Sequence, residues 1–147
     1  MLIYIASDHG GFEFKSLYSE YLTSLGHEVR DFGPIELSPS DDYPKFVVPT
    51  IQAMQENPEA KGILICRNGV GVSILANKFK GIRCALSWTS KHIKTAREDD
   101  DVNVLAIPAD YIDGENAKLL IDTFLNTPFS QEERHIRRLK EVEDIEE

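Results

Sequence analysis

The chain has 147 residues, 41% of them hydrophobic, which is enough for one domain with its own buried core. Its formal net charge of −9 argues against nucleic acid or an anionic membrane surface as the main partner. The two cysteines, Cys66 and Cys84, have no metal-type spacing and indicate no disulfide framework. No segment approaches the roughly 20 apolar residues of a membrane helix, and the first apolar run is too short for a signal peptide. We therefore expect a cytoplasmic protein.

Strands and helices alternate from the N-terminus onward. The apolar run Leu2–Ala6 predicts a strand that ends in the polar glycine turn 7–11. A helix is expected next, closed by Gly26. Its apolar residues at helical spacing are Phe14, Leu17, Tyr18, Tyr21, Leu22 and Leu25. Glu28–Phe32 predicts a second strand, and Pro44 begins a second helix after a surface loop.

Residues 61–83, KGILICRNGVGVSILANKFKGIR, combine a strand, a glycine loop and a helix. The apolar run Gly62–Ile65 is short enough for a strand buried on both faces, and the helix is expected from Ser73 to Gly81. Backbone N–H groups converge at such a helix N-terminus, where they hold a phosphate, a carboxylate or a developing oxyanion. The loop matches neither of the common phosphate-binding glycine patterns, so its ligand stays open at this point.

Cys66 stands where this strand meets the glycine loop. The positive end of the helix dipole favours the thiolate, whose ordinary pKa is about 8.5. One interpretation is a base or nucleophile beside an oxyanion pocket. The other is a small residue that ends a buried strand, as free cysteines often do. The local pattern favours neither.

The C-terminal half continues the alternation. Ile82–Ser87 and Val102–Ile107 predict strands, and residues 89–99 and 114–126 predict helices. Strand and helix alternating five times predicts an α/β fold with right-handed crossovers and a five-stranded parallel sheet covered by helices on both faces. We expect a single domain over residues 1–147.

Ligands of such folds bind at the carboxyl ends of the strands. Three polar groups are expected to converge there: Asp8-His9, Cys66-Arg67-Asn68 and the run 99–103 next to the last strand. Three polar groups at one edge indicate a catalytic pocket more strongly than any one of them alone.

The tail, residues 131–147, predicts a final helix beyond the completed domain. Arg134 and Arg138 stand four residues apart and share a face, where they repel by roughly 0.2–0.5 kcal/mol unless an anion lies between them. A phosphate would offset this repulsion. Taken alone, however, the pattern favours an ordinary charged face paired with glutamates. We expect residues 129–147 to pack on a partner subunit.

Five motifs occur together in this chain: SDHGG at 7–11, DYP at 42–44, ILICRNGVGVSILANKFKGIR at 63–83, NVLAI at 103–107 and RHIRR at 134–138. Together they resemble ribose-5-phosphate isomerase B and its relatives, the galactose-6-phosphate isomerase subunits, over nearly the whole chain. The resemblance implies a Rossmann-like three-layer α/β/α sandwich and a homodimer or tetramer with sites at the subunit interface, without metal or cofactor. The implied reaction interconverts aldose and ketose phosphates through a cis-enediolate.

The resemblance also implies residue roles. Cys66 is the expected base that moves a proton between C1 and C2, and Asp8 and His9 are expected to hold sugar hydroxyls or phosphate. Arg134 and Arg138 are the expected phosphate clamp. The backbone amides expected to form the anion hole are those of Gly69, Val70, Gly71, Val72 and Ser73. Asn103, in the matched NVL segment, is expected to be a hydrogen-bonding residue at a strand edge and not a substrate ligand.

The chain departs from the family pattern mainly at its ring-opening end. The family's ring-opening histidine is Asp99 here, followed by Asp100 in place of an asparagine. Where the family has a glycine, this chain has Arg67, and Asn68 replaces a threonine of the family's catalytic set. Asp110 stands at the position of a phosphate-binding arginine of the family. We keep Asp99 and Asn68 among the expected catalytic residues, and Arg67 and Asp100 among the expected substrate-binding ones.

Ring opening therefore has three interpretations. Asp99 serves as the acid or base if burial and its acidic neighbours hold its proton. Alternatively, residues 99–101 are only a solvated acidic turn, or His9 takes over ring opening. Three functions follow: an isomerase of ribose 5-phosphate, an isomerase of a hexose or tetrose phosphate, or a non-catalytic sugar-phosphate-binding subunit.

Overall fold

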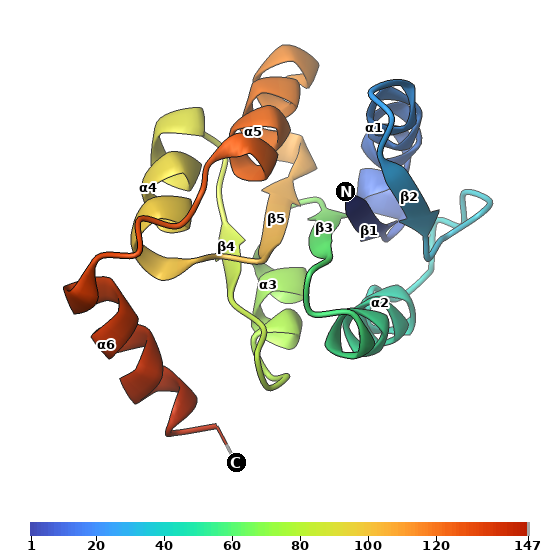
Figure 1. Cartoon of the computed structure of the whole chain (residues 1–147). Coiled ribbons are helices and arrows are strands. Elements are labelled where there is room, and N and C mark those ends of the chain that lie inside the picture. The colour runs from blue at the N-terminus through green and yellow to red at the C-terminus, as the bar shows by residue number, and fades with distance from the viewer. Residues whose placement is uncertain (147) are drawn as a thin grey trace.

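One five-stranded parallel sheet organises residues 1–146, the part of the chain that the computed structural model describes (Figure 1). The strands are β1 (Leu2–Ser7), β2 (Glu28–Asp31), β3 (Lys61–Cys66), β4 (Cys84–Leu86) and β5 (Val104–Pro108). They lie in the order β2-β1-β3-β5-β4. The register pairs Ser7 with Ile65 and Cys66 with Pro108, so β1, β3 and β5 end at the same edge.

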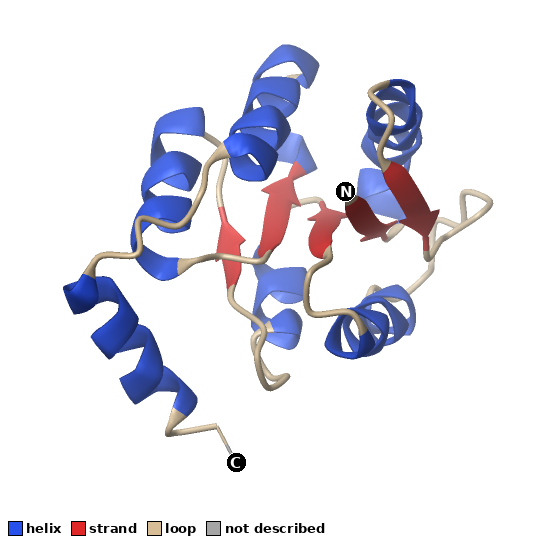
Figure 2. Ribbon diagram, viewed as in Figure 1, coloured by secondary structure: helices blue, strands red, loops and turns tan. Residues whose placement is uncertain are grey.

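Helices cover both faces of the sheet (Figure 2). They are α1 (Phe12–Ser24), α2 (Pro44–Glu56), α3 (Val70–Ala76), α4 (Ser90–Asp100), α5 (Gly114–Asn126) and α6 (Glu133–Glu143), with short 3₁₀ turns η1 (His9–Gly11) and η2 (Ala109–Tyr111). Side chains of α1, α4 and α5 share one core cluster, and those of α2 and α3 share the other. The predicted three-layer α/β/α architecture is therefore confirmed.

The central strands are apolar on both faces because both faces are covered. In β1, Ile3 and Ile5 join one cluster while Tyr4 and Ala6 join the other. The same alternation runs through β3 and β5, whose residues are buried almost throughout. Continuous apolar runs, and not an apolar–polar alternation, are typical of such strands.

Several predicted boundaries are wrong by a few residues. Helix α3 begins at Val70 and not at Ser73, because Asn68 Oδ1 accepts a hydrogen bond from the Val70 N–H at 3.0 Å. Helix α6 cannot begin at Gln131, whose φ of 60° lies in the left-handed region. Leu17 and Leu25 belong to the helical spacing of apolar residues, yet each is 53% exposed, since α1 turns Tyr18 and Leu22 toward the sheet instead.

Helix α6 lies apart from the sheet, at the red end of the chain in Figure 1. His135 is buried, and its Nδ1 lies 2.8 Å from Ser130 Oγ. In contrast, Ile136 and Val142 are exposed on the helix, and Ile145 is exposed just beyond its end. These apolar side chains are therefore largely uncovered in one chain. Within residues 1–146, no helix combines the length and hydropathy needed to cross a membrane.

Candidate active site

The turns that follow β1, β3 and β5 form a cleft at the carboxyl edge of the sheet. Asp8 follows β1, Cys66 ends β3, and Asp110 lies in η2 just after β5. The cleft has a volume of about 350 Å³, and His9, Arg67 and Asp110 contribute to its walls. The structure thus brings together two of the three polar groups that the sequence places at this edge.

The glycine loop after β3 packs too closely for side chains. Gly69 has a φ of +72°, and a Cβ there would lie 2.4 Å from Leu86 Cδ1 and 3.2 Å from the Pro108 backbone nitrogen. A Cβ on Gly71 would lie 2.7 Å from the Tyr43 ring. Position 69 therefore requires glycine, whereas a side chain at position 71 would have to displace the Tyr43 ring.

Not all five amides expected in the anion hole are free to bind a ligand. The Gly69 N–H donates to Cys66 Sγ at 3.1 Å, and the Ser73 N–H donates to the Gly69 carbonyl at 3.2 Å. The Val70 N–H is bonded to the Asn68 side chain. Gly71 and Val72 lie in the first helical turn, where N–H groups have no intrahelical acceptor. The Val72 N–H acts on the Cys66 sulfur, so the Gly71 amide is the one best placed to receive an anion.

Burial raises the pKa of the Cys66 thiol above its usual value, and the nearby Asp8 carboxylate acts in the same direction. The backbone N–H groups of Val72, Gly69 and Asn68 oppose the shift without cancelling it. The expected lowering by the helix dipole is therefore wrong as a net effect. Cys66 is only 5% exposed, and α3 has only 7 residues, so desolvation of the thiolate outweighs the helix terminus.

This shift predicts a pH-dependent reactivity. Since only the thiolate is alkylated, the rate of Cys66 modification by iodoacetamide is expected to rise about tenfold per pH unit from pH 7 to 9. Burial raises the pKa of Cys84 to about 12, so its contribution is small. Mass spectrometry of the alkylated peptide measures the rate, with Cys66→Ala as the blank. A rate that levels off below pH 8 would contradict the raised pKa.

Arg67 and Asp110, two departures from the family pattern, lie side by side in the cleft. Arg67 Nη1 is 3.5 Å from Asp110 Oδ2, and the Asp110 N–H donates to the Arg67 carbonyl at 2.9 Å. Both side chains are largely exposed. The cleft therefore carries a cation and an anion on one wall.

Residues 99–103 lie at the opposite edge of the sheet from Cys66. They precede β5, and the beginning of a parallel strand lies at the amino edge. The expectation that they share an edge with Cys66 in one chain is therefore wrong. Asp99 is also not buried: its side chain is 52% exposed, and its Oδ1 lies 3.7 Å from His135 Nε2. Asp100 lines a groove between α6 and β4.

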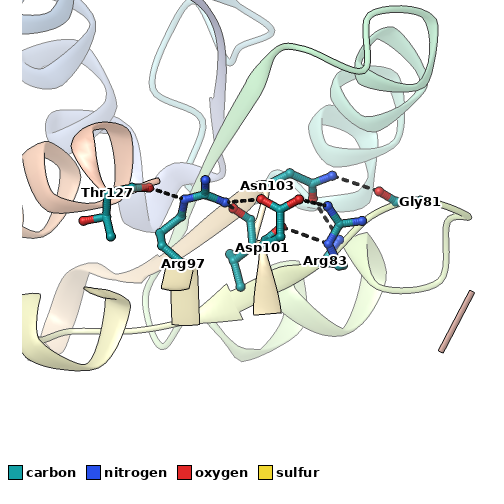
Figure 3. A network of polar contacts seen from close by, with 7 residues as sticks. Gly81, Arg83, Arg97, Asp101, Asn103 and Thr127 are labelled. Carbon is teal, nitrogen blue, oxygen red and sulfur yellow. Dashed lines mark hydrogen bonds and ion pairs between the residues drawn. The ribbon is translucent and has the colours of Figure 1, made fainter. Parts of the chain in front are cut away.

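A polar network holds the turn between α4 and β5 (Figure 3). Buried Arg97 donates to Asp101 Oδ1 at 2.8 Å, and Arg83 donates to Asp101 Oδ2 at 3.0 Å. Asn103 Oδ1 accepts from the Arg83 N–H, and its Nδ2 donates to the Gly81 carbonyl, each at 2.8 Å. Asn103 thus makes hydrogen bonds as expected, although it lies just before β5, an inner strand, and not at a strand edge.

The two arginines of the expected phosphate clamp lie on α6. Arg134 and Arg138 are exposed, and Arg134 Nε donates to Glu132 Oε2 at 2.9 Å. Helix α6 contacts α4 near the amino edge. The expected site residues thus fall into two groups within one chain: one around Cys66, and one formed by Asp99, Asp100, Arg134 and Arg138.

Asp41 is a site residue that the sequence analysis missed. Its carboxylate lies 2.8 Å from His9 Nδ1, although the two residues are 32 positions apart in the chain. The only sequence signal is its place beside the DYP motif. For metals, residues 1–146 contain no group of three or more His, Cys, Asp or Glu side chains that could hold an ion.

Comparisons with known proteins agree over nearly the whole chain. The model of the Ribose/Galactose Isomerase family matches residues 3–142. Probable ribose-5-phosphate isomerase B of Mycoplasma pneumoniae is 45% identical over 95% of this chain and 91% of that protein. Ribose-5-phosphate isomerase B of Mycobacterium tuberculosis is 34% identical over 95% of this chain and 86% of that protein.

Solved structures give the same result. Ribose-5-phosphate isomerase B of Mycoplasma genitalium, crystallised with bound ribulose 5-phosphate, aligns with a TM-score of 0.94 and 36% identity. The alignment covers 97% of this chain and 94% of that one. Sequence motifs, fold and these comparisons lead to one conclusion: the chain belongs to the ribose/galactose isomerase family.

Proposed function

We propose that this protein interconverts ribose 5-phosphate and ribulose 5-phosphate through a cis-enediolate, with Cys66 as the base. The observation that carries the proposal is the position of the thiol, at the end of β3 and 3.1 Å from the backbone nitrogen of Gly69 in the glycine loop. Relatives named ribose-5-phosphate isomerase B match this chain over almost their full length, and one of them binds ribulose 5-phosphate in its crystal.

The proposed proton transfer takes place at the end of β3, beside the glycine loop. The Cys66 thiolate removes the C2 proton of the open-chain aldose, and the carbonyl oxygen O1 takes up the negative charge. The N–H group of Gly71 stabilises this oxyanion, an arrangement in which one donor is worth about 10²–10³-fold in kcat. The O2 proton then passes to O1, and Cys66 returns its proton to C1. Asn68, whose Oδ1 lies 3.9 Å from the sulfur, borders the reacting carbons.

The second group of residues supports a shared site. Asp99, Asp100, Arg134 and Arg138 lie at the amino edge and on α6, away from Cys66 in the same chain. We infer a homodimer in which α6 and the α4–β5 turn of one subunit complete the cleft of the other. The exposed Ile136, Val142 and Ile145 supply an apolar surface for that contact. The free thiols Cys66 and Cys84 fit the reducing cytoplasm.

Proton exchange with solvent tests the proposed chemistry. In deuterated water, the protein is expected to convert ribose 5-phosphate to ribulose 5-phosphate with deuterium at C1, because the Cys66 proton equilibrates with solvent. NMR detects both the product and the label. Turnover without label would contradict a solvent-exchanging base, and binding without turnover would favour a non-catalytic subunit.

A second candidate is an isomerase of another sugar phosphate. The Arg67–Asp110 pair favours it, because these side chains change the charge on the wall of the cleft. The same NMR measurement with galactose 6-phosphate and erythrose 4-phosphate separates the candidates. A higher kcat/KM for ribose 5-phosphate than for either would exclude the second.

A further inference from the structure

Tyr43, the middle residue of the DYP motif, places a phenol beside the glycine loop. It directly precedes α2, and its carbonyl accepts a hydrogen bond from the Val47 N–H at 3.0 Å, which ties it to the first turn of that helix. A Cβ built on Gly71 would lie 2.7 Å from Tyr43 Cζ and 2.9 Å from its hydroxyl oxygen. The hydroxyl therefore lies next to the residue whose N–H is best placed to receive an anion.

Tyr43 and Cys66 lie on the same face of the sheet. Cys66 belongs to the core cluster that β1, β3 and β5 share with α2 and α3, and the Tyr43 ring packs against that cluster. The N–H groups of Val72 and Gly69, on both sides of Gly71, act on the Cys66 sulfur. The first turn of α3 thus brings together the sulfur, the Gly71 amide and the phenol.

The Tyr43 hydroxyl is open to a ligand. The Tyr21 hydroxyl, in contrast, donates to the Asp122 carboxylate at 2.9 Å. No such bond holds the Tyr43 hydroxyl within residues 1–146, and the ring that carries it is only half-buried. The enclosed side-chain oxygens that lack a partner in this part of the chain belong to Ser7, Ser19 and Asp41. The Tyr43 oxygen is therefore accessible, although its ring is fixed by packing.

We propose that the Tyr43 phenol carries the proton from O2 to O1 of the enediolate. This inference rests on the proposed isomerase function. The phenol O–H bond breaks as its proton passes to O1, and the phenol oxygen takes up the proton of the O2 hydroxyl in the same step. Tyr43 therefore ends as it began, and the freed electron pair forms the C2 carbonyl as C1 receives its proton from Cys66.

The other groups around the loop are unsuited to this transfer. A backbone N–H such as that of Gly71 donates a hydrogen bond but cannot accept the O2 proton. Cys66 already holds the proton that it has taken from carbon. A phenol donates and accepts at one oxygen, so it can relay a proton without a change in its own charge.

Isomerisation needs this transfer, whereas exchange at carbon does not. Cys66 can remove a C1 proton from ribulose 5-phosphate and return a deuteron from solvent to the same carbon. Conversion to ribose 5-phosphate requires in addition that O1 lose its proton and that O2 gain one. The ratio of C1 exchange to conversion therefore measures the relay separately from the base.

Tyr43→Phe removes the hydroxyl and keeps the ring against Gly71. We expect conversion of ribulose 5-phosphate to fall about 10²–10⁴-fold while C1 exchange keeps roughly the wild-type rate, so the ratio rises by the same factor. NMR in deuterated water follows both reactions in one sample, and thermal unfolding checks that the variant is folded. Tyr21→Phe is the matched control, since its hydroxyl bonds Asp122 between α1 and α5, and it should keep the wild-type ratio.

Gly71→Ala moves the phenol without removing it. The new Cβ would displace the Tyr43 ring, and the backbone N–H is kept. The ratio of exchange to conversion is therefore expected to rise in this variant as well. A ratio that stays at the wild-type value would contradict the position of the hydroxyl at the enediolate.

An unchanged ratio in Tyr43→Phe, with equal loss of both reactions or with no loss, would overturn the inference. The transfer would then belong to Asp8, the other acid–base side chain whose charge acts on the Cys66 thiol. A wild-type protein that neither exchanges deuterium into ribulose 5-phosphate nor converts it would instead overturn the proposed function.

Discussion

Replacing Cys66 with alanine is expected to lower kcat for ribose 5-phosphate by about 10²–10⁴-fold, the usual worth of a positioned acid–base group. The reason is local: Cys66 is the titratable side chain at the end of β3 that contacts the glycine loop, and its sulfur is bonded to the Gly69 N–H. Deuterium exchange into ribulose 5-phosphate should fall by the same factor, because both reactions need the base. Coupled assays of kcat and NMR exchange measure the two effects.

Cys84→Ala is the control for thiol loss, since Cys84 lies in β4 and outside the cleft. It should keep wild-type turnover. A Cys66→Ala protein that retains more than a tenth of wild-type kcat would remove Cys66 from the mechanism.

Mixing inactive variants tests whether two chains share a site. Cys66→Ala and Arg138→Ala are each expected to be nearly inactive, but co-refolded heterodimers contain one site with both native residues. Activity regained on mixing would support the shared site, whereas none would contradict it.

Gly69→Ala is expected to have the second largest effect. The residue has a φ of +72°, where an L side chain costs roughly 1–2 kcal/mol, and the new Cβ would lie 2.4 Å from Leu86 Cδ1. The neighbouring Pro108 backbone nitrogen, at 3.2 Å, cannot rotate away as a side chain can. The loop must therefore shift, and its amides leave the positions that stabilise the oxyanion. We expect kcat to fall about 10²–10³-fold.

Gly81→Ala separates backbone strain from crowding. Gly81 has a φ of +77°, but a Cβ there would have no neighbour within 4 Å. Urea unfolding should show about 1–2 kcal/mol of destabilisation for Gly81→Ala and more for Gly69→Ala, with kcat unchanged only in the former. Equal kcat values for the two variants would show that the close packing at Gly69 does not position the anion hole.

The sequence predicts the fold well because strands that are buried on both faces appear in it as continuous apolar runs. Runs such as Gly62–Ile65 contain no polar position, and each lies between segments with helical spacing. The edge on which a polar residue lies depends on whether it precedes or follows its strand. This is why the prediction for Asp8 and Cys66 is correct and that for residues 99–103 is wrong.

Other features of the site depend on contacts that no local pattern records. The pairing of His9 with Asp41 joins residues 32 positions apart, through a loop whose composition indicates only a surface. The pKa of Cys66 depends on how much water the folded chain excludes, and a motif cannot give that balance. Local sequence thus identifies the reactive thiol but not its electrostatic environment.

The hydrogen bonds and ion pairs around Asp101 determine which residues of the α4–β5 turn can be substituted. Arg97, Arg83 and Asn103 hold the backbone of the α4–β5 turn from the inner side, while Asp99 and Asp100 take no part in that network and stay exposed. Selection can therefore exchange these two side chains, for instance a histidine for Asp99, at little cost to folding. Single substitutions at positions 99 and 100 can therefore alter the surface that this turn presents without disturbing the residues that hold its backbone.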